Sequence, residues 1–297
     1  MATQAQVPQV PRRTLAMALV ARLRRPTVGM VVTTIVLLAL VVVMVIPYLY
    51  MALSAFKVNS EIFSYPLTLW PRQWTWDNLS ALVHQFPYGR WYVNTIVVAA
   101  VGTMLSVSLS SLAGFAFAKY DFRFKNVLFT IMLATLMIPF QVLLVPQFQI
   151  IKTFNWFNSY QALFVPSAVG AFGIFLMRQY TVGVPSELLD AARIDGSSEF
   201  AIWWRVVLPL VRPGLAVLAI LSFTNYWNDF FWPLIVTTQP WMFVINLGLA
   251  SLIGPYDYQY GIQLCGALLA SLPVIIVFLI FQRQFVEGLT QGAFKGA

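Results

Sequence analysis

The most informative polar segment of the chain, which we call the polar loop, runs from 183 to 209 between two apolar stretches. Its first half mixes acidic and very small side chains: Glu187, Asp190, Ala191, Ala192 and Asp195. Acidic residues near the start of a helix are stabilised by the helix dipole. Small side chains let another surface approach the backbone closely. The pattern predicts a short helix that docks into a groove on a partner protein or, alternatively, lies on the lipid surface.

The second half of the polar loop predicts another helix after a break. Gly196 suits the left-handed residue that ends a helix, and Ser186 and Ser197 are placed to cap the helices on its two sides. An apolar face then recurs at spacings of three and four: Phe200, Trp203, Trp204, Val207 and Leu208. We expect Pro209 to end this pattern, because proline interrupts the hydrogen bonds of a helix.

Residues with catalytic or metal-binding potential do not gather in the sequence. His84 is the sole histidine and Cys265 the sole cysteine, and no carboxylate pair completes a metal spacing. The sequence also lacks a Gly-x-x-x-x-Gly-Lys-Ser/Thr loop, so this chain cannot cradle ATP by that route. We therefore expect no catalytic residue, no bound metal and no enzyme activity in this chain.

Composition places the whole chain in a membrane. Charged residues make up 9% of the 297 residues and hydrophobic residues 60%, and the mean hydropathy is +0.77. An ordinary soluble domain is about 25% charged, and its surface needs more polar cover than this sequence supplies. The net charge of +8 does not indicate nucleic-acid binding, because the basic residues are spread between apolar runs rather than gathered on one face.

Six apolar stretches are long enough to cross a bilayer, which takes about 20 mostly apolar residues. They lie at about 28–56, 92–118, 127–151, 160–177, 214–236 and 263–281. Each must be helical, because lipid cannot satisfy open backbone groups. Five prolines in or near them are expected to kink continuous helices rather than end them: Pro47, Pro139, Pro146, Pro166 and Pro273. The predicted fold is an all-α, polytopic transmembrane bundle of six spanning helices.

The placement of lysine and arginine predicts the orientation. With the N-terminus inside, all but four of the 18 basic residues fall in inner segments, and the exceptions are Lys57, Arg72, Arg90 and Lys152. The expected organisation is a cytoplasmic tail over 1–27, a transmembrane domain over 28–285 with an outer loop at 57–91 and a cytoplasmic loop at 178–212, and a cytoplasmic tail over 286–297. The basic stretch 1–25 precedes an apolar run too long for a cleaved signal, so we expect an uncleaved first span.

Asp229 is the only charged residue within the predicted spans. A charge in lipid is costly and usually functional. With Asn225, Trp227 and Asn228 nearby, it predicts a polar lining of a translocation path. Two other interpretations stay open, a structural hydrogen bond to a partner chain and a position at the membrane interface.

The polar loop resembles the cytoplasmic loop of bacterial ABC-importer permeases. The family pattern is Glu-Ala-Ala, three residues, Gly, nine residues, Ile, any residue and Leu-Pro. At the matching positions this chain has Asp190-Ala191-Ala192, Gly196, Val206 and Leu208-Pro209, with Asp for Glu and Val for Ile. The segments 227–230 and 282–296 are similar to the carbohydrate-uptake branch, specifically to the maltose-permease G-type subunit, and the likeness covers roughly 28–296.

This resemblance implies a permease subunit of an ATP-driven importer for a sugar or oligosaccharide, in the bacterial plasma membrane. It implies a second, different permease, a dimer of ATP-binding subunits that hold ATP and Mg, and a soluble solute-binding protein outside, with no cofactor in this chain. The residues that it assigns to ATPase coupling are Glu187, Asp190, Ala191, Ala192, Asp195, Gly196 and Pro209. Those that it assigns to an ATPase interface are Gly288, Thr290, Gly292 and Lys295.

Three alternatives compete with the sugar importer. Related permeases carry a sugar phosphate such as glycerol phosphate, so that substrate stays open. A channel or secondary carrier without an ATPase is disfavoured, because the spans hold almost no ionisable residue. An intramembrane enzyme is disfavoured, because the spans hold no Ser/His, His/Glu or paired-Asp arrangement.

Overall fold

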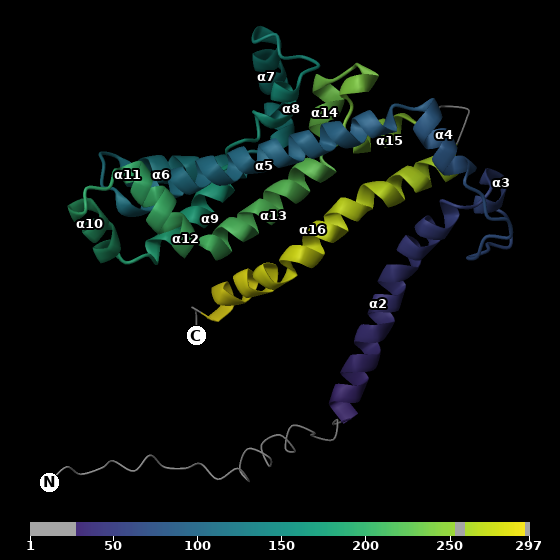
Figure 1. Cartoon of the computed structure of the whole chain (residues 1–297), viewed down its shortest axis with the longest axis horizontal. Helices are drawn as coiled ribbons and strands as arrows, with labels where there is room; N and C mark the ends of the chain where they lie inside the picture. Colours follow the sequence, from purple (N-terminus) through teal and green to yellow (C-terminus); the bar gives the residue numbers. More distant parts are fainter. Residues whose placement is uncertain (1–27, 253–258, 295–297) are drawn as a thin grey trace. The chain divides into compact units, whose positions relative to one another are not determined.

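The computed structural model describes residues 28–252 and 259–294, with side chains described as far as residue 282 (Figure 1). Within these ranges the chain forms helices joined by turns, with no strand, which confirms the predicted all-α class. The contacts divide the chain into two units, 1–50 and 51–297, which are described separately.

Helix α2 (Val28–Ser54) supplies the described part of the first unit and continues into the second at Met51. Its residues from 28 to 49 are all exposed, and nearly all of them are apolar. A helix that is apolar on every side belongs in lipid or a large core. Pro47 lies inside it without ending it, as predicted.

Helix α5 (Tyr88–Lys119) is the central element of the second unit. Helices α9 (Ala171–Val182) and α13 (Arg212–Asn228) pack along it, while α16 (Tyr260–Phe294) packs against α13 and α4 (Asp77–Gln85). Figure 1 shows α13 lying between α5 and α16. These contacts form the frame that holds the polar groups of the site.

Two glycines bring α5 and α9 into close contact. A Cβ on Gly114 would lie 2.7 Å from the backbone nitrogen of Arg178, and one on Gly173 would lie 2.6 Å from Oγ of Ser110. Small residues are the usual means of close helix packing in lipid, where tails offer no hydrophobic driving force. The α5–α9 pair is therefore a fixed platform for the polar loop that follows α9.

Shorter helices connect these long ones. In chain order they are α3 (Asn59–Ile62), α6 (Lys125–Ala134), η1 (Thr135–Met137), α7 (Phe140–Thr153), α8 (Tyr160–Phe164), α10 (Ser186–Ile194), α11 (Glu199–Ile202), η2 (Trp203–Val207), α12 (Leu208–Leu210), α14 (Phe231–Val236), η3 (Pro240–Met242) and α15 (Ile245–Ser251). Helices α10 to α12 are the folded form of the polar loop.

The third, fourth and fifth of the six predicted spans are each divided into shorter helices instead of being one continuous helix. In the described chain, α2, α5 and α16 are each long and apolar enough to cross a membrane. Up to two more spans arise if bent pairs are counted, α6–η1 with α7 at 104° and α11–α12 with α13 at 87°. The fourth predicted span is divided between α8 and α9, and the fifth ends at Asn228.

Prolines explain where these spans break. Ile138 is extended (φ −84°, ψ 117°), as favoured before a proline, and Pro139 is the N-cap residue that precedes α7. The ring of Pro233 would meet the carbonyl four residues earlier, that of Asp229, so α13 stops there. Pro166 likewise follows the end of α8. The predicted kinks are wrong at Pro139 and Pro166, whereas the other three prolines stay inside helices: Pro47, Pro146 and Pro273.

Candidate functional site

The polar loop turns at Gly196 as the sequence predicts. Gly196 follows α10 with a φ of +79°, in the left-handed region. Its N–H donates to the Arg193 carbonyl and the Ser197 N–H donates to the Ala192 carbonyl, both at 3.0 Å. This pair of bonds is a Schellman turn, which satisfies open carbonyls at a helix end. The predicted left-handed glycine is confirmed.

The two predicted serine caps are wrong by one position each. Ser186 is the first residue of α10, and the N-cap position is Pro185, which has no side-chain cap. Ser198 rather than Ser197 caps α11, accepting a hydrogen bond from the Ala201 N–H at 3.3 Å. Ser197 is already part of the Schellman turn, so the cap moves to the next hydroxyl.

One face of the polar loop is buried against the long helices. Leu189 of α10 is 1% exposed and lies in a core cluster with Ile202, Val207, Phe115 of α5 and Met177 of α9. Full burial of a leucine side chain contributes about 1.5–3 kcal/mol. Leu189 therefore anchors α10 to the α5–α9 platform.

The opposite face is exposed and carries large apolar side chains. The exposed fraction is 87% for Ile194, 64% for Phe200 and 59% for Trp204. The predicted apolar face is thus wrong for Phe200 and Trp204 but confirmed for Trp203 and Val207, which are buried. For Trp204 the cause is the π-helical turn η2, whose longer hydrogen-bond step shifts side chains out of the 3.6-residue repeat.

An ion-pair network joins the two halves of the polar loop. The Arg193 guanidinium donates to Asp190 Oδ1 and to Glu199 Oε1, each at 2.8 Å, and the Tyr120 hydroxyl donates to Glu199 Oε2. The hydrogen bonds from Arg193 and Tyr120 hold the pKa of Glu199 below its ordinary value. Burial, together with the bond to Glu199, raises the pKa of Tyr120 to about 12. Because Tyr120 directly follows α5, the network also ties the loop to that helix.

The residues predicted for coupling lie mostly on the outside of the loop. Those that are exposed are Glu187, Asp190, Ala191, Asp195, Gly196 and Pro209, whereas Ala192 is half-buried. The helical run that starts at Glu199 ends at Leu210, so the prediction that Pro209 ends it is wrong by one residue.

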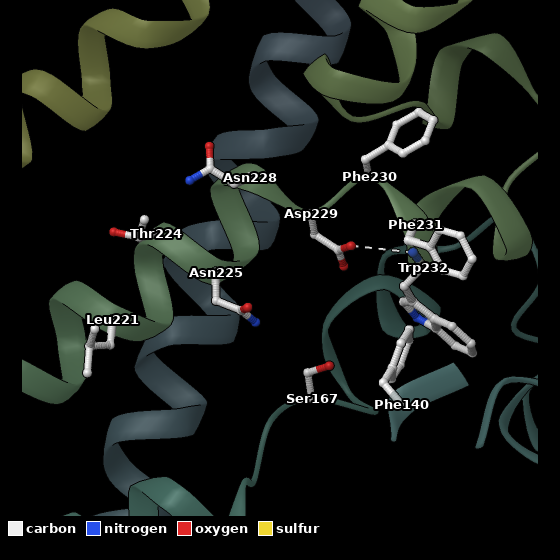
Figure 2. A pocket seen from close by; sticks show the side chains of 10 residues that line it. All are labelled: Phe140, Ser167, Leu221, Thr224, Asn225, Asn228, Asp229, Phe230, Phe231 and Trp232. Carbon is white, nitrogen blue, oxygen red and sulfur yellow. Dashed lines mark hydrogen bonds between the residues drawn. The ribbon is translucent and has the colours of Figure 1, made fainter. Parts of the chain in front are cut away.

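A second polar region lies where α13 breaks. A pocket of about 850 Å³ is lined by the end of α13, the start of α14 and two other segments: Phe140, Ser167, Leu221, Thr224, Asn225, Asn228, Asp229, Phe230, Phe231 and Trp232. Figure 2 shows Asn225, Asp229 and Ser167 around the same space, while Asn228 and Thr224 point away from them in this view. The pocket thus combines amide, hydroxyl and carboxylate groups with aromatic rings.

Asp229 has a structural partner as well as a place in the pocket. It ends α13, and its Oδ1 accepts the Trp232 N–H at 3.3 Å, at the start of α14 (Figure 2). No group of three His, Cys, Asp or Glu side chains that could hold a metal occurs among the described residues. The carboxylate can therefore stabilise the break in the chain and accept hydrogen bonds from a ligand.

Trp227 does not line this pocket, but it lines a smaller hollow together with Asn228. Its side chain is 2% exposed, it stacks on Phe223 at 5.4 Å between ring centroids, and its Nε1 donates to the Ala270 carbonyl at 3.0 Å. The structure therefore brings Asn225, Asn228 and Asp229 to the pocket and places Trp227 in the core between α13 and α16.

Comparison with known proteins identifies the family. The profile of the family described as "Binding-protein-dependent transport system inner membrane component" matches residues 106–291. This chain belongs to that family. As an inner-membrane component it is a membrane-embedded permease.

Curated relatives match the permease over most of their length. It is 40% identical to the arabinooligosaccharides transport system permease protein AraQ of Halalkalibacterium halodurans, covering 85% of this chain and 91% of the relative. It is 33% identical to the lactose transport system permease protein LacG of Rhizobium radiobacter (82% and 89% covered). It is 32% identical to the sn-glycerol-3-phosphate transport system permease protein UgpE of Yersinia pestis (86% and 94% covered).

A solved structure shares the fold of the permease. A chain of the bacterial ABC transporter involved in the import of the acidic polysaccharide alginate superposes with a TM-score of 0.78, at 20% identity, over 93% of this chain and 99% of that one. The likeness supports the fold of the helical bundle.

The permease site also contains residues that the sequence analysis missed. Ser222 Oγ donates to Ser106 Oγ at 3.1 Å, in a neighbouring hollow that shares Ser167 and Asn225 with the pocket. Ser222, Asn225 and Asp229 lie three and four residues apart, a helical spacing that could have revealed a polar stripe. No comparable signal marked Ser167, because only the break after α8 brings it there.

The predicted tail contacts lie at the edge of the described chain. Gly288, Thr290 and Gly292 lie on the helical backbone of α16, beyond the last described side chain, and Lys295 lies outside the described residues. Their role at an ATPase interface stays a prediction.

Proposed function

We propose that this permease subunit forms half of the translocation path of an ATP-driven importer for a neutral sugar or oligosaccharide. The observation that carries the substrate class is the 40% identity, over most of both chains, to an arabinooligosaccharide transport permease protein. The lactose relative has a substrate of the same class by its name.

The chemistry of the pocket supports a neutral sugar over a sugar phosphate. Asn225 and Ser167 can donate hydrogen bonds to sugar hydroxyls and can also accept them. Phe140 and Phe231, which are 39% and 47% exposed, offer apolar ring surface. The lining contains no lysine or arginine, and the Asp229 carboxylate would repel a phosphate. The glycerol-phosphate relative therefore suggests a common architecture rather than a common substrate.

The polar loop is proposed to dock on an ATP-binding subunit rather than on lipid. Its exposed face offers Ile194, and burying such a side chain contributes about 1.5–3 kcal/mol. Glu187, Asp190 and Asp195 are exposed on the same short helix. An anionic inner leaflet attracts basic segments and would repel these acids, whereas a basic groove on a protein would complement them.

Movement of α10 would reach the spans through two links to the end of α5. One is the Tyr120–Glu199–Arg193 network, and the other is the Lys119 ammonium, which donates to the Val184 carbonyl just before α10. Both links start from adjacent residues at the end of the central helix. In the proposed mechanism, closure of the ATPase dimer displaces α10, and α5 transmits the displacement to the pocket-lining helices.

The proposal includes the partners that the resemblance implies. They are a second permease, two ATP-binding subunits that supply ATP and Mg, and a solute-binding protein on the outside. Both termini and the polar loop are proposed to face the cytoplasm of a bacterium, with 57–91 outside. Support for the binding protein comes from the family description, which names binding-protein-dependent transport.

The test is uptake by the reconstituted complex. The permease, co-purified with its partners in proteoliposomes that contain ATP, should accumulate a labelled arabinooligosaccharide and should not accumulate glycerol 3-phosphate. Vesicles without ATP are the control. Uptake without ATP but with a proton gradient would instead identify a secondary carrier, and uptake of glycerol 3-phosphate alone would overturn the assigned substrate.

A further inference from the structure

A separate hollow lies where α5 turns into α6, and it shares no lining residue with the pocket or the polar loop. It encloses about 360 Å³ and is lined by two basic side chains, Lys125 and Arg178, together with Asp121, Asn126, Phe122 and Phe124. Neither Lys125 nor Arg178 belongs to the proposed path or to the coupling contacts. Two cations against one carboxylate give the hollow a net positive charge.

The single acid in the hollow does not neutralise it. The Lys125 ammonium lies 3.3 Å from Asp121 Oδ1, but the Asp121 side chain is fully exposed, and exposed ion pairs are weak. An ammonium has three donors, and this contact uses one of them. Lys125 itself is only 19% exposed, so its charge is held within the hollow rather than extended into water.

Arg178 is held in place by contacts that leave its terminal nitrogens available. Its Nε donates to the Phe117 carbonyl at 3.2 Å, and its guanidinium lies 4.5 Å above the Phe129 ring. These contacts use one N–H and one face of the planar group. The two terminal nitrogens form a fork that suits the oxygens of a phosphate.

Aromatic rings beside these cations indicate a lipid rather than a soluble anion. Phe122 is 40% exposed and Phe124 is 61% exposed, next to the basic groups at the ends of two apolar helices. Arg123 lies 4.8 Å above the Phe124 ring and adds a third positive charge at the edge. Apolar rings and snorkelling basic residues together are typical of the level of the lipid headgroups.

We propose that this hollow binds the headgroup phosphate of an anionic phospholipid of the inner leaflet, with Lys125 and Arg178 as its charge partners. The inference rests on the proposed orientation, which puts the α5–α6 turn at the cytoplasmic surface, where anionic lipids attract basic residues. The Phe122 and Phe124 rings contact the first part of the acyl chains. A bound lipid would join the α5–α6 turn to α9, which leads directly into the polar loop.

The test is lipid binding by the purified importer complex, measured by native mass spectrometry with added phosphatidylglycerol or phosphatidylcholine. Wild type should retain phosphatidylglycerol in preference to phosphatidylcholine. The double variant Lys125→Gln/Arg178→Gln should bind it about thirtyfold more weakly, since each basic group near a membrane surface is worth about fivefold in affinity. Arg205→Gln, which removes an exposed charge outside the hollow, is the matched control and should bind like wild type.

Further arms separate the possible failures. If the double variant does not assemble, Lys125→Gln and Lys125→Arg replace it, and only the first should lose the preference. Equal binding of phosphatidylglycerol by wild type and a charge-removed variant would overturn the site. Inorganic phosphate displacing the lipid completely at millimolar concentration would also overturn it in favour of a soluble anion. The experiment measures lipid binding and not sugar uptake. A failure of the proposed transport function can therefore be distinguished from a failure of the proposed lipid site.

Discussion

Substitution of Gly196 tests the turn in the polar loop, and the backbone conformation there sets the energetic cost of the substitution. A Cβ at Gly196 would meet no atom of this chain within 4 Å, so within the subunit a larger residue causes no clash. The cost is conformational, because its φ of +79° is left-handed. That conformation costs an L-residue about 1–2 kcal/mol, and a β-branched side chain is a stronger outlier there.

This conformational cost would strongly disfavour the turn at Gly196 but would leave the folding of the helical bundle nearly unchanged. About 1–2 kcal/mol shifts an equilibrium by a factor of roughly 5–30, and the turn formed by the Schellman bonds of Ser197 and Gly196 would be disfavoured by that factor. The spans do not contact this position. Gly196→Val and Gly196→Ala should therefore assemble normally while losing most sugar uptake and most binding-protein-stimulated ATP hydrolysis in proteoliposomes.

Gly196→Asn is the matched control that separates the effect of backbone strain from the effect of added side-chain volume. Asparagine adopts the left-handed region readily, so it adds volume with little strain. We expect it to retain most activity. Wild-type activity in both Gly196→Val and Gly196→Ala would refute the requirement for the left-handed turn. Equal loss in Gly196→Asn and Gly196→Val would show that bulk at a contact, not backbone strain, is responsible.

Three further predictions concern the pocket, the ion-pair network and the orientation. Asp229→Asn keeps an oxygen for the Trp232 N–H but removes the charge, so the variant should assemble and show lower uptake. Asp229→Ala also removes the acceptor of the Trp232 N–H, so it should lose about 1 kcal/mol of stability as well, measured by thermal unfolding. Normal uptake by Asp229→Asn would make the carboxylate purely structural. Because the pKa of Glu199 is lowered, its ion pair with Arg193 is fully formed at every pH above the ordinary carboxyl pKa. The pair is lost only as the pH falls through the lowered pKa. Titration of Glu199 should therefore not change coupling, measured as sugar imported per ATP hydrolysed, between pH 6 and 8 in the wild type. Glu199→Gln should lower this ratio over the whole range. An unaltered ratio in the variant would exclude the network from coupling. The orientation can be tested with single cysteines placed in a chain that lacks the buried Cys265. Cysteines at the exposed positions Ser60 and Gln73 should be labelled from outside the cell, and a cysteine at Ser198 should be labelled only after permeabilisation. External labelling at Ser198 would reverse the orientation.

The sequence predicted best the features that a few neighbouring residues determine. Gly196 is left-handed because the turn chemistry is local, and α2 is a continuous helix because nothing along it can compete for its backbone. The motif from Asp190 to Pro209 therefore located the loop without any knowledge of its surroundings.

The features that failed depend on partners distant in the sequence or on small changes of helical step. Pro146 stays within α7, whereas Pro139 stands between η1 and α7 after an extended residue, although both are prolines in the same apolar stretch. The π-turn at Trp203 moved Trp204 to the surface. Trp227 is buried and donates a hydrogen bond to Ala270, 43 residues away, which no local pattern indicates; its role in a translocation path stays a prediction.

The most direct test of the central claim is a cross-link from α10 to an ATP-binding subunit. Ala191 is exposed on α10, and Ser60 is exposed in the segment proposed to face outside. A photoactivatable cross-linker on Ala191→Cys, in the Cys265→Ala chain co-expressed with its partner subunits, should capture an ATP-binding subunit, and the same reagent on Ser60→Cys should not. Failure to capture an ATP-binding subunit from Ala191→Cys, in a complex that still imports sugar, would contradict coupling through this loop.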